Sequence, residues 1–341
     1  MKGFLRKVLL GSAAALLIAA GGAVLSLEES YRGFQGQVFV RVERGVGAIG
    51  IGRGLEQAGV IRSAWQFWIA RAMRPSAKLQ AGEYRFEEAD TVWRVFDRLA
   101  HGDVYFLEFT VPEGSNIFDI AHAVGGTGII SAEDFLRAAS DPSPIHDLAP
   151  AAKTLEGYLF PATYRLTHST TAVQLCRQMT GQFRRQWNKL AGGRTVDVHK
   201  MVTLASLVEK ETGVPGERTL VAGVFANRIR KGLRLECDPT TIYAALLESR
   251  YRGAIFRSDL ASHNAYNTYQ NTGLPPGPIA NPGAEAIAAA LDPAKTSYLF
   301  FVAKPSGGGH QFSSTLPEHE RAVREYRNGS KTATKSPRKA G

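Results

Sequence analysis

The hydrophobic and polar positions of this chain fall into separate segments, and the first is an apolar run over residues 8–27 without a charged side chain. A helix of about 20 apolar residues spans the hydrocarbon core of a bilayer. Lys2, Arg6 and Lys7 precede the run, and basic residues favour the cytoplasmic side. We therefore expect a single-pass protein of the cell inner membrane, with residues 1–7 cytoplasmic, a transmembrane helix at 8–27 and the bulk of the chain periplasmic.

A cleaved signal peptide is the alternative, because the chain starts with basic residues and the run is rich in Ala and Gly. The run is longer than the apolar part of a signal peptide, which has about 7 to 15 residues. Residues 25–27, Leu-Ser-Leu, also lack the small-x-small pattern of a cleavage site. The uncleaved anchor is the favoured interpretation.

Residues 38–110 combine short alternating stretches with helical periods. The pattern predicts strand, helix, helix, strand and helix, over residues 38–43, 48–58, 64–73, 79–86 and 92–100. This order resembles a LysM-like module, a small fold that binds N-acetylated glycans. We expect a LysM-like domain over residues 38–110.

The next segment, residues 111–190, repeats features of the first. Gly45 and Gly59 recur as Gly114 and Gly128, each 69 residues later. Two further pairs follow at an offset of 68 residues, Ser63 with Ser131 and Phe67 with Phe135. Two copies are too few for a solenoid, so the pattern favours a duplicated β-α unit with linking helices. A chance likeness between strand-turn-helix units is the alternative.

Residues 191–328 carry helical patterns and two strand patterns, and we expect one further domain there. Helices are predicted over residues 198–211, from 217, from 281 to 291 and over 317–327, and strands over 297–303 and 310–314. Asp238 and Asn281 each precede a proline, which is typical of a helix N-cap. The basic tail, residues 329–341, is expected to be disordered. The fold class is α+β.

An apolar stripe in the helix over residues 198–211 ends on an acid. Leu204, Leu207 and Val208 recur at i, i+3 and i+4, and the next position of the stripe is Glu211. Glu209 is turned about 200° away from Glu211 and belongs to the face that normally meets water. The two glutamates are therefore predicted to have different environments.

Gly213 and Pro215 end this helix just after Glu211, which places its carboxyl at a turn where a cleft can form. A carboxyl in a dry setting has a raised pKa, as a general acid requires. The structural alternative is an acid in a last helical turn that is half-exposed or paired with an arginine.

The sequence around the two glutamates is similar to the core signature of the endolytic lytic transglycosylase family called MltG or YceG-like. The matching blocks are E-K-E-T-x-V-x-x-E-R at 209–218, V-F-x-N-R-I at 224–229, R-L-x-x-D-P-T-x-x-Y at 234–243, A-Y-N-T-Y at 265–269, G-L-P-P-G-P-I at 273–279 and N-P-G at 281–283. The resemblance covers residues 38–328. It implies a catalytic domain over 191–328, and Glu211 followed by Thr212 is similar to the catalytic Glu-Ser pair of other lytic transglycosylases.

A polar and aromatic cluster supplies the candidate substrate-binding residues, because amides, hydroxyls and flat rings suit sugar surfaces. These candidates are Asn264, Tyr266, Asn267, Thr268 and Tyr269, together with Asp238, which has a smaller claim beside its N-cap role. Glu217 is interpreted as a first-turn acid that complements the helix dipole. His310 is interpreted as structural.

Another block of the family resemblance, residues 155–164, has Ala162 where relatives more usually carry an acid. This departure argues against a catalytic role for the loop. Glu156 in this block is left open between the groove and a turn-stabilising role.

Charge and cysteine content narrow the alternatives. Seven basic residues in the two ends account for most of the net charge of +10, so the middle of the chain carries only about +3, which argues against a nucleic-acid groove. Cys176 and Cys237 fit no metal spacing and no disulfide framework. We predict no metal and no cofactor.

Three functions remain open. The first is a transglycosylase that cuts MurNAc-GlcNAc bonds within peptidoglycan glycan strands and forms 1,6-anhydroMurNAc. The second is a membrane-anchored peptidoglycan-binding scaffold without catalysis, and the third is a hydrolytic muramidase with Asp238 or Glu217 as a second acid. The resemblance favours the first, and implies that the protein terminates nascent glycan chains beside a penicillin-binding peptidoglycan synthase.

Overall fold

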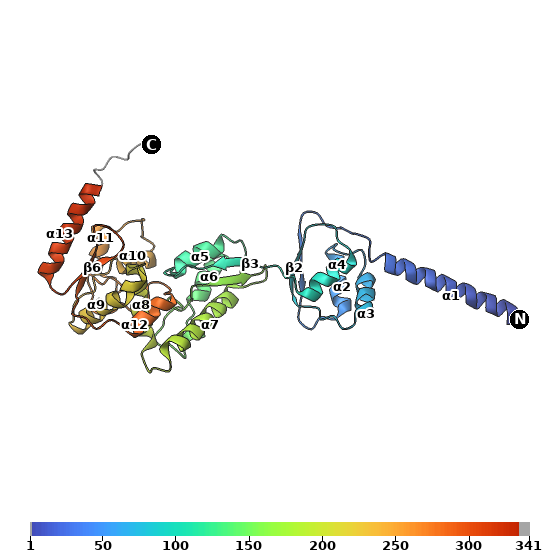
Figure 1. The fold of residues 1–341 in the computed structure, drawn as a ribbon, viewed down its shortest axis with the longest axis horizontal. Helices are drawn as coiled ribbons and strands as arrows, with labels where there is room; N and C mark the ends of the chain where they lie inside the picture. Colours follow the sequence, from blue (N-terminus) through green and yellow to red (C-terminus); the bar gives the residue numbers. More distant parts are fainter. Residues whose placement is uncertain (1, 334–341) are drawn as a thin grey trace. The chain divides into compact units, whose positions relative to one another are not determined.

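The computed structural model describes residues 2–333 and shows a mixed α+β chain that is mostly helical. The described strands form three two-stranded sheets. Contacts divide the chain into two compact units, residues 1–107 and residues 108–341 (Figure 1). Each unit is described by itself below.

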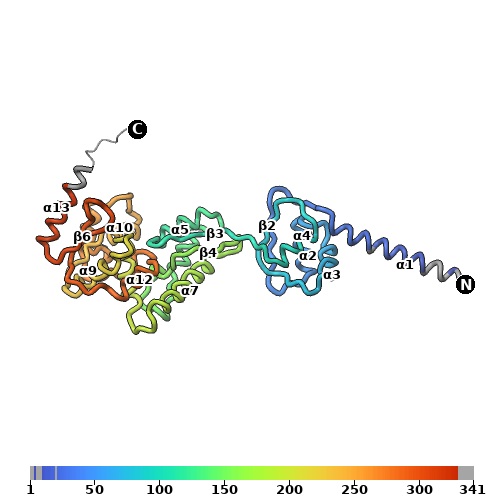
Figure 2. The backbone as a smooth tube through the Cα atoms, in the orientation of Figure 1, coloured from blue at the N-terminus to red at the C-terminus, as the bar shows by residue number. Residues whose placement is uncertain are grey.

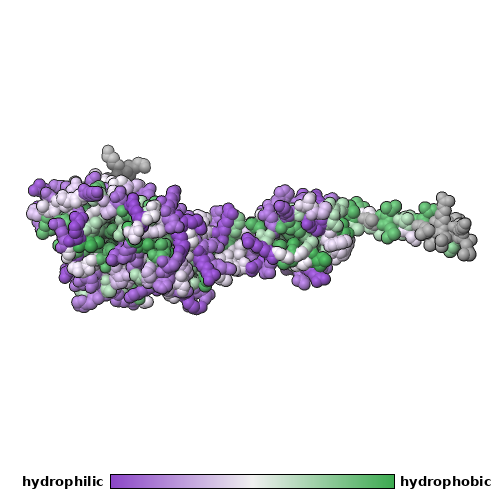
Figure 3. All heavy atoms as spheres, turned by 90° about the horizontal axis from the view of Figure 1, so that it is seen from below, coloured by the Kyte–Doolittle hydropathy of each residue, from purple (hydrophilic) through white to green (hydrophobic). Residues whose placement is uncertain are grey.

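The first unit begins with a long helix, α1 (Lys2–Leu25), which covers most of the predicted membrane segment. Leu16, Leu17 and Ile18 are exposed, and the coloured part of this helix is largely hydrophobic in Figure 3. Within residues 2–333, no helix combines the length and the apolar character that crossing a membrane requires. The anchor at residues 8–27 therefore stays a prediction.

The rest of the first unit has the predicted order of elements. These are β1 (Val38–Val42), α2 (Ala48–Gln57), α3 (Ala64–Met73), β2 (Gly82–Phe86) and α4 (Val92–His101). The two strands pair antiparallel, with Val38 opposite Phe86 and Val42 opposite Gly82. The helices bury Leu55, Phe67 and Phe96 against this hairpin, as the apolar stripes of amphipathic helices require.

The second unit begins with the same order of elements. It contains β3 (Leu107–Thr110), α5 (Ile117–Gly125), α6 (Ala132–Ala139), β4 (Thr163–Leu166) and α7 (Ala172–Ala191), with β3 beside β4 (Figure 2). Gly45 and Gly114 share a left-handed backbone, with φ of 85° and 75°, and so do Gly59 and Gly128, with 72° and 70°. The element order and these turns agree with a duplicated unit.

The remainder of the second unit is arranged around α8 (Val198–Glu211), which contacts α9 (Arg218–Arg230), α10 (Asp238–Leu247) and α12 (Ala284–Leu291) (Figure 1). Residues 202–208 of α8 are all buried. A short helix, α11 (Arg257–Leu260), and the antiparallel hairpin of β5 (Phe300–Ala303) and β6 (His310–Ser313) complete this part.

The last helix, α13 (Leu316–Ala333), is longer than predicted and includes the first residues of the predicted disordered tail. Its first part packs on β5 and β6. Once packing has formed the first turns, adding further turns costs little, which accounts for the extension. Residues 334–341 of the predicted tail lie outside the described residues.

Asn281 does not cap α12, in contrast to the prediction. Gly283 occupies the N-cap, and Asn281 is fully buried. The Asn281 side chain accepts from the Leu159 N–H at 2.8 Å and donates to the Ser115 carbonyl at 2.9 Å. The amide joins distant segments: it gives the buried Leu159 N–H a partner, and the Ser115 carbonyl accepts from the Asn281 backbone N–H as well.

Candidate active site

The end of α8 places Glu211 as the stripe predicts. Leu204, Leu207 and Val208 are buried, and Glu211 is the last residue of the helix. The chain then leaves the helix at Thr212, whose backbone is extended and whose hydroxyl accepts from the Val214 N–H at 3.0 Å. The Glu211 carboxyl therefore lies at an open helix end.

Glu211 lines a cleft of about 370 Å³. The walls come from α8, α9, the turn into α10, the polar loop over residues 264–269, β5 and α13. The lining residues are Glu211, Phe225, Arg228, Leu235, Glu236, Cys237, Asp238, Tyr269, Phe300, Phe301, Leu316 and His319. Carboxyl groups among aromatic side chains suit a sugar, because polar groups can bond its hydroxyls while rings cover its C–H faces.

The surroundings of Glu211 raise the pKa of its carboxyl. Burial is the largest cause, and the charge of Asp238 acts in the same direction. A hydrogen bond from the Cys237 thiol and the charge of His310 act in the opposite direction. The net effect keeps the proton on Glu211 to a higher pH than usual, as proton donation requires.

The prediction that Glu209 meets water is wrong. Its side chain is only 8% exposed, accepts from the Gly283 N–H at 2.9 Å and lies 4.0 Å from the Arg218 guanidinium. The face of α8 that pattern assigns to solvent packs instead against the start of α12 and the turn at Gly114. Burial raises the pKa of Glu209 too, so the pKa does not separate the two glutamates. Position does, because Glu211 lines the cleft and Glu209 does not.

The polar loop over residues 264–269 contributes less to the cleft than predicted. Asn267 and Thr268 are buried, and their side chains bond to the protein itself: the Asn267 amide donates to Asp259, Leu260 and Ser262, and the Thr268 hydroxyl bonds Thr240 and the Cys237 N–H. Asn264 donates to Glu248, and the Tyr266 ring packs on Tyr243. These four residues build the loop, and Tyr269 alone among the loop candidates lines the cleft.

The prediction that Asp238 is the N-cap of α10 is wrong, because Asp238 is the first residue of the helix. Cys237 takes the N-cap position without a side-chain capping bond. The helix therefore starts one residue earlier than the Asp-Pro pattern predicts, directly after a turn in which Glu236 has a left-handed backbone, φ 53°. The Asp238 carboxylate is free to accept from the Tyr269 hydroxyl at 2.6 Å beside the cleft.

Glu217 and His310 form a pair that the sequence does not predict. The Glu217 carboxylate accepts from the His310 backbone N–H at 2.8 Å and lies 2.7 Å from its Nδ1. A Cβ on Gly309 would come within 2.4 Å of that carboxylate, so the glycine lets the two approach. Glu217, at the N-cap of α9, therefore also holds β6 against the start of this helix.

Glu156 lies in the interior and not in the cleft. Its carboxyl accepts from the Ile117 N–H and from the Asn281 amide, each at 3.0 Å, and is hydrogen-bonded with Tyr243. Burial raises the pKa of Glu156 to about 8. Since the pattern of residues 155–164 contains no helical or strand period around this acid, only its position in the fold reveals this role.

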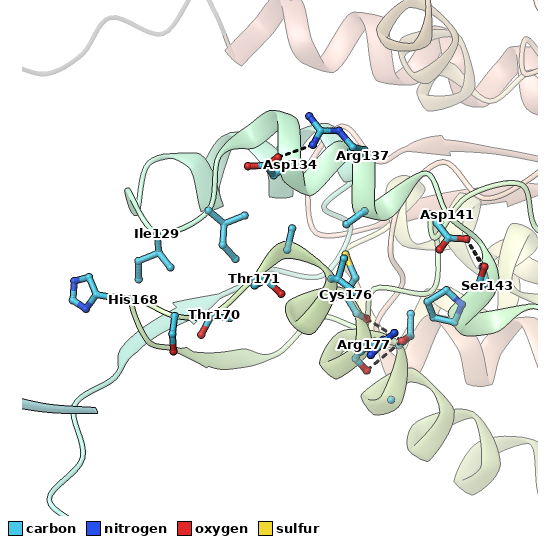
Figure 4. A pocket seen from close by; sticks show the side chains of 18 of the residues that line it. Ile129, Asp134, Arg137, Asp141, Ser143, His168, Thr170, Thr171, Cys176 and Arg177 are labelled. Atoms are coloured by element: carbon cyan, nitrogen blue, oxygen red, sulfur yellow. Dashed lines mark hydrogen bonds and ion pairs between the residues drawn. The ribbon is translucent and has the colours of Figure 1, made fainter. Parts of the chain in front are cut away.

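A larger cavity of about 900 Å³ lies between α6 and α7 (Figure 4). The two carboxylates that line it already have partners. Asp134 accepts from the Arg137 guanidinium at 2.9 Å, and Asp141 accepts from Ser143. It therefore offers no acid comparable to Glu211. In the part of the chain that the structure describes, no group of three or more His, Cys, Asp or Glu side chains could hold a metal ion.

Comparison with known proteins agrees with this geometry. The YceG-like family pattern matches residues 40–325. The chain is 32% identical to the endolytic murein transglycosylase of Bacillus subtilis over 329 residues, 90% of each chain. It is 28% identical over 323 residues to the endolytic murein transglycosylase of Streptococcus pneumoniae D39, which covers 85% of this chain and 58% of the relative. The crystal structure of a yceG-like protein from Listeria monocytogenes is 31% identical, with a TM-score of 0.57, over 84% of this chain and 99% of that one. The chain therefore belongs to the YceG-like family.

Proposed function

We propose that the protein is an endolytic murein transglycosylase. It cleaves the MurNAc-GlcNAc bond within peptidoglycan strands and leaves a 1,6-anhydroMurNAc end. The observation that carries this proposal is a carboxyl of raised pKa, Glu211, at an open helix end in an aromatic cleft. The names of the relatives from Bacillus subtilis and Streptococcus pneumoniae support it.

In the first step, Glu211 donates its proton to the glycosidic oxygen that leaves. The charge that develops at C1 of the muramic ring needs a partner. Two-carboxylate glycosidases supply a second acid at about 5 to 9.5 Å, whereas a substrate-assisted route uses the 2-acetamido group of the sugar itself. We assign the substrate-assisted route, because Glu217 and Glu209 are engaged with His310 and Gly283, and Asp238 in the cleft accepts from the Tyr269 hydroxyl.

In the second step, the Glu211 carboxylate takes the proton of the C6 hydroxyl as this oxygen bonds to C1. The attack is intramolecular, so it competes with water when the ring is held in place. Tyr269 and Asp238, which are joined by a hydrogen bond of 2.6 Å at the cleft, are the side chains we assign to this holding role. No water is consumed, and the product is lighter by one water than a hydrolytic product.

Hydrolysis is the second candidate, because Asp238 adds another carboxylate to the same cleft. Digestion of glycan strands in ¹⁸O-labelled water separates the two reactions. Transglycosylation gives an unlabelled anhydro end by mass spectrometry. Label at the new muramic end would instead make the protein a muramidase with Asp238 as its second acid. If purified protein releases no muropeptides at all, the scaffold function is the remaining one.

The location and partners are part of the same proposal. The exposed apolar side chains of α1, among them Leu16 and Ile18, support an inner-membrane anchor with the rest of the chain in the periplasm. The LysM-like module over residues 38–110 would bind glycan, and the enzyme would terminate nascent strands beside a penicillin-binding synthase. An alkaline phosphatase fused after Gly341 is active only if the C-terminus is periplasmic, so an inactive fusion contradicts the topology.

A further inference from the structure

The Cys237 thiol meets the Glu211 carboxyl inside the cleft. Cys237 is 2% exposed and lines the same cleft as Glu211. Its backbone occupies the N-cap of α10, where a side chain usually bonds the helix N–H groups, yet it makes no such bond. The thiol is hydrogen-bonded with Glu211 instead, and burial holds its pKa well above the usual range, so it donates as a neutral S–H.

The turn before Cys237 has a strained backbone conformation, which neighbouring side chains must hold in place. Glu236 has φ 53°, a conformation that residues other than glycine rarely adopt. Arg228 holds this turn at two points: it donates to the Leu235 carbonyl at 3.0 Å and pairs with the Glu236 carboxylate at 2.7 Å. The direction of the chain at Cys237 is therefore fixed from the side of α9.

A second clamp fixes Cys237 from the polar loop. The Cys237 N–H donates to the Thr268 hydroxyl at 3.0 Å, and the Cys237 carbonyl accepts from the Thr240 hydroxyl at 2.6 Å. The two threonine hydroxyls are 2.9 Å apart and both are buried. The backbone that carries this thiol is thus held by hydrogen bonds on both sides.

We propose that Cys237 is a positioning residue for Glu211, which holds the carboxylate toward the cleft after the proton has been donated. The role rests on the proposed function of Glu211 as the acid. A thiol is a weak donor, so it orients the carboxylate while stabilising its charge less than a hydroxyl or amide does. Such a partner suits a group that must keep its proton in the first step and regain one in the second.

Other charged and titratable groups surround Glu211, and two of them shift its pKa: Asp238 raises it and His310 lowers it. Asp238 and Glu236 come from the turn into α10, Arg228 from α9, His319 from α13 and His310 from β6. Because these groups stay in place when the thiol is removed, a single substitution at Cys237 isolates the hydrogen bond.

The test is the pH profile of kcat/KM for the full chain with glycan strands, comparing Cys237→Ala with wild type. Loss of a donor to the carboxylate raises the pKa of Glu211, so the alkaline limb should move to higher pH by up to about one unit. Cys176→Ala is the matched control, because Cys176 is equally buried at 2% exposed but lies on α7. This control should leave the limb unchanged.

An unmoved limb in the Cys237→Ala protein, or an equal shift in the Cys176→Ala protein, would overturn the role. If the alanine variant lacks a cooperative thermal transition, the comparison is made between Cys237→Ser and Cys237→Val. The serine hydroxyl can donate to Glu211 and the valine side chain cannot, so the alkaline limb of the Cys237→Ser protein must lie at lower pH than that of the Cys237→Val protein. Glu211→Gln separates the two levels of the proposal. Full activity of that variant refutes Glu211 as the acid, whereas its inactivity with an unmoved Cys237→Ala limb refutes the positioning role alone.

Discussion

The two glutamates near the end of α8 are separated by a single residue, and they face different parts of the fold. Glu211 lines the cleft, where it meets a thiol and aromatic walls. Glu209 faces the start of α12, where a backbone N–H and Arg218 hold it in the interior. Both are shielded from water, so burial alone does not mark a catalytic acid. The difference is whether the carboxyl borders a space that a substrate can enter.

The Glu209 side of α8 packs against the turn at Gly114 in the second β-α-α-β-α segment, and this segment differs from the first in the length of one connection. The connection from α3 to β2 covers residues 74–81, whereas the corresponding connection from α6 to β4 covers residues 140–162. The longer connection carries Glu156 into a core shared with Asn281 and Tyr243. This connection therefore adds buried hydrogen bonds between the second segment and the part of the chain that holds the cleft.

The largest expected effect is the loss of activity when Glu211, on the cleft side of α8, is substituted. Glu211→Gln should lower kcat by about 10² to 10⁴, because the amide cannot donate the proton. Its thermal unfolding should match that of the wild type. Glu209→Gln is the matched variant: it should keep most of the activity and lose about 1 kcal/mol of stability, because Arg218 loses a charged neighbour. Muropeptide release and calorimetry measure the two quantities, and an equal loss of activity in both variants would contradict the distinction.

The long connection gives the next largest effect. A Cβ at Gly157 would lie 2.5 Å from Pro278 and 2.9 Å from Val202, at a left-handed φ of 87°. Gly157→Ala should cost about 3 kcal/mol or more, since backbone strain and overpacking add. Gly128→Ala has a similar φ of 70° with nothing within 4 Å, so it should cost only about 1 to 2 kcal/mol. Urea unfolding of both variants tests the comparison; equal costs would mean that the loop is not tightly packed.

A further expected effect is a pH dependence of stability from Glu156. Burial raises the pKa of this carboxyl from 4.5 to about 8 in the folded protein. The folded state therefore binds the proton more tightly than the unfolded state, and this contribution to stability is complete below pH 4.5 and is lost as the pH rises through about 8. Glu156→Gln should remove that part of the decline. The free energy of unfolding, measured for both proteins from pH 5 to 9, should differ in slope, and parallel curves would exclude the raised pKa.

The sequence by itself determined the elements and the apolar stripe that ends at Glu211. Periodicity placed the helices and strands of residues 38–101, the helix that ends at Glu211 and the hairpin of residues 300–313, because these depend on neighbours along the chain. The left-handed glycines at 45, 59, 114 and 128 likewise follow from local turns. The motif blocks around Glu211 were enough to indicate the family.

Only the tertiary structure decided the environments of the polar residues. Glu209 was assigned to water because a helical wheel cannot show that α12 covers that face. Asn267 and Thr268 have the chemistry of sugar contacts, but their hydrogen bonds go to backbone and hydroxyl groups that are far along the chain or folded back on the loop. Cys237 had no assigned role until the turn at Glu236 brought its thiol to Glu211. Local patterns fix backbone shape, whereas the partner of a polar group depends on which distant segments fold against it.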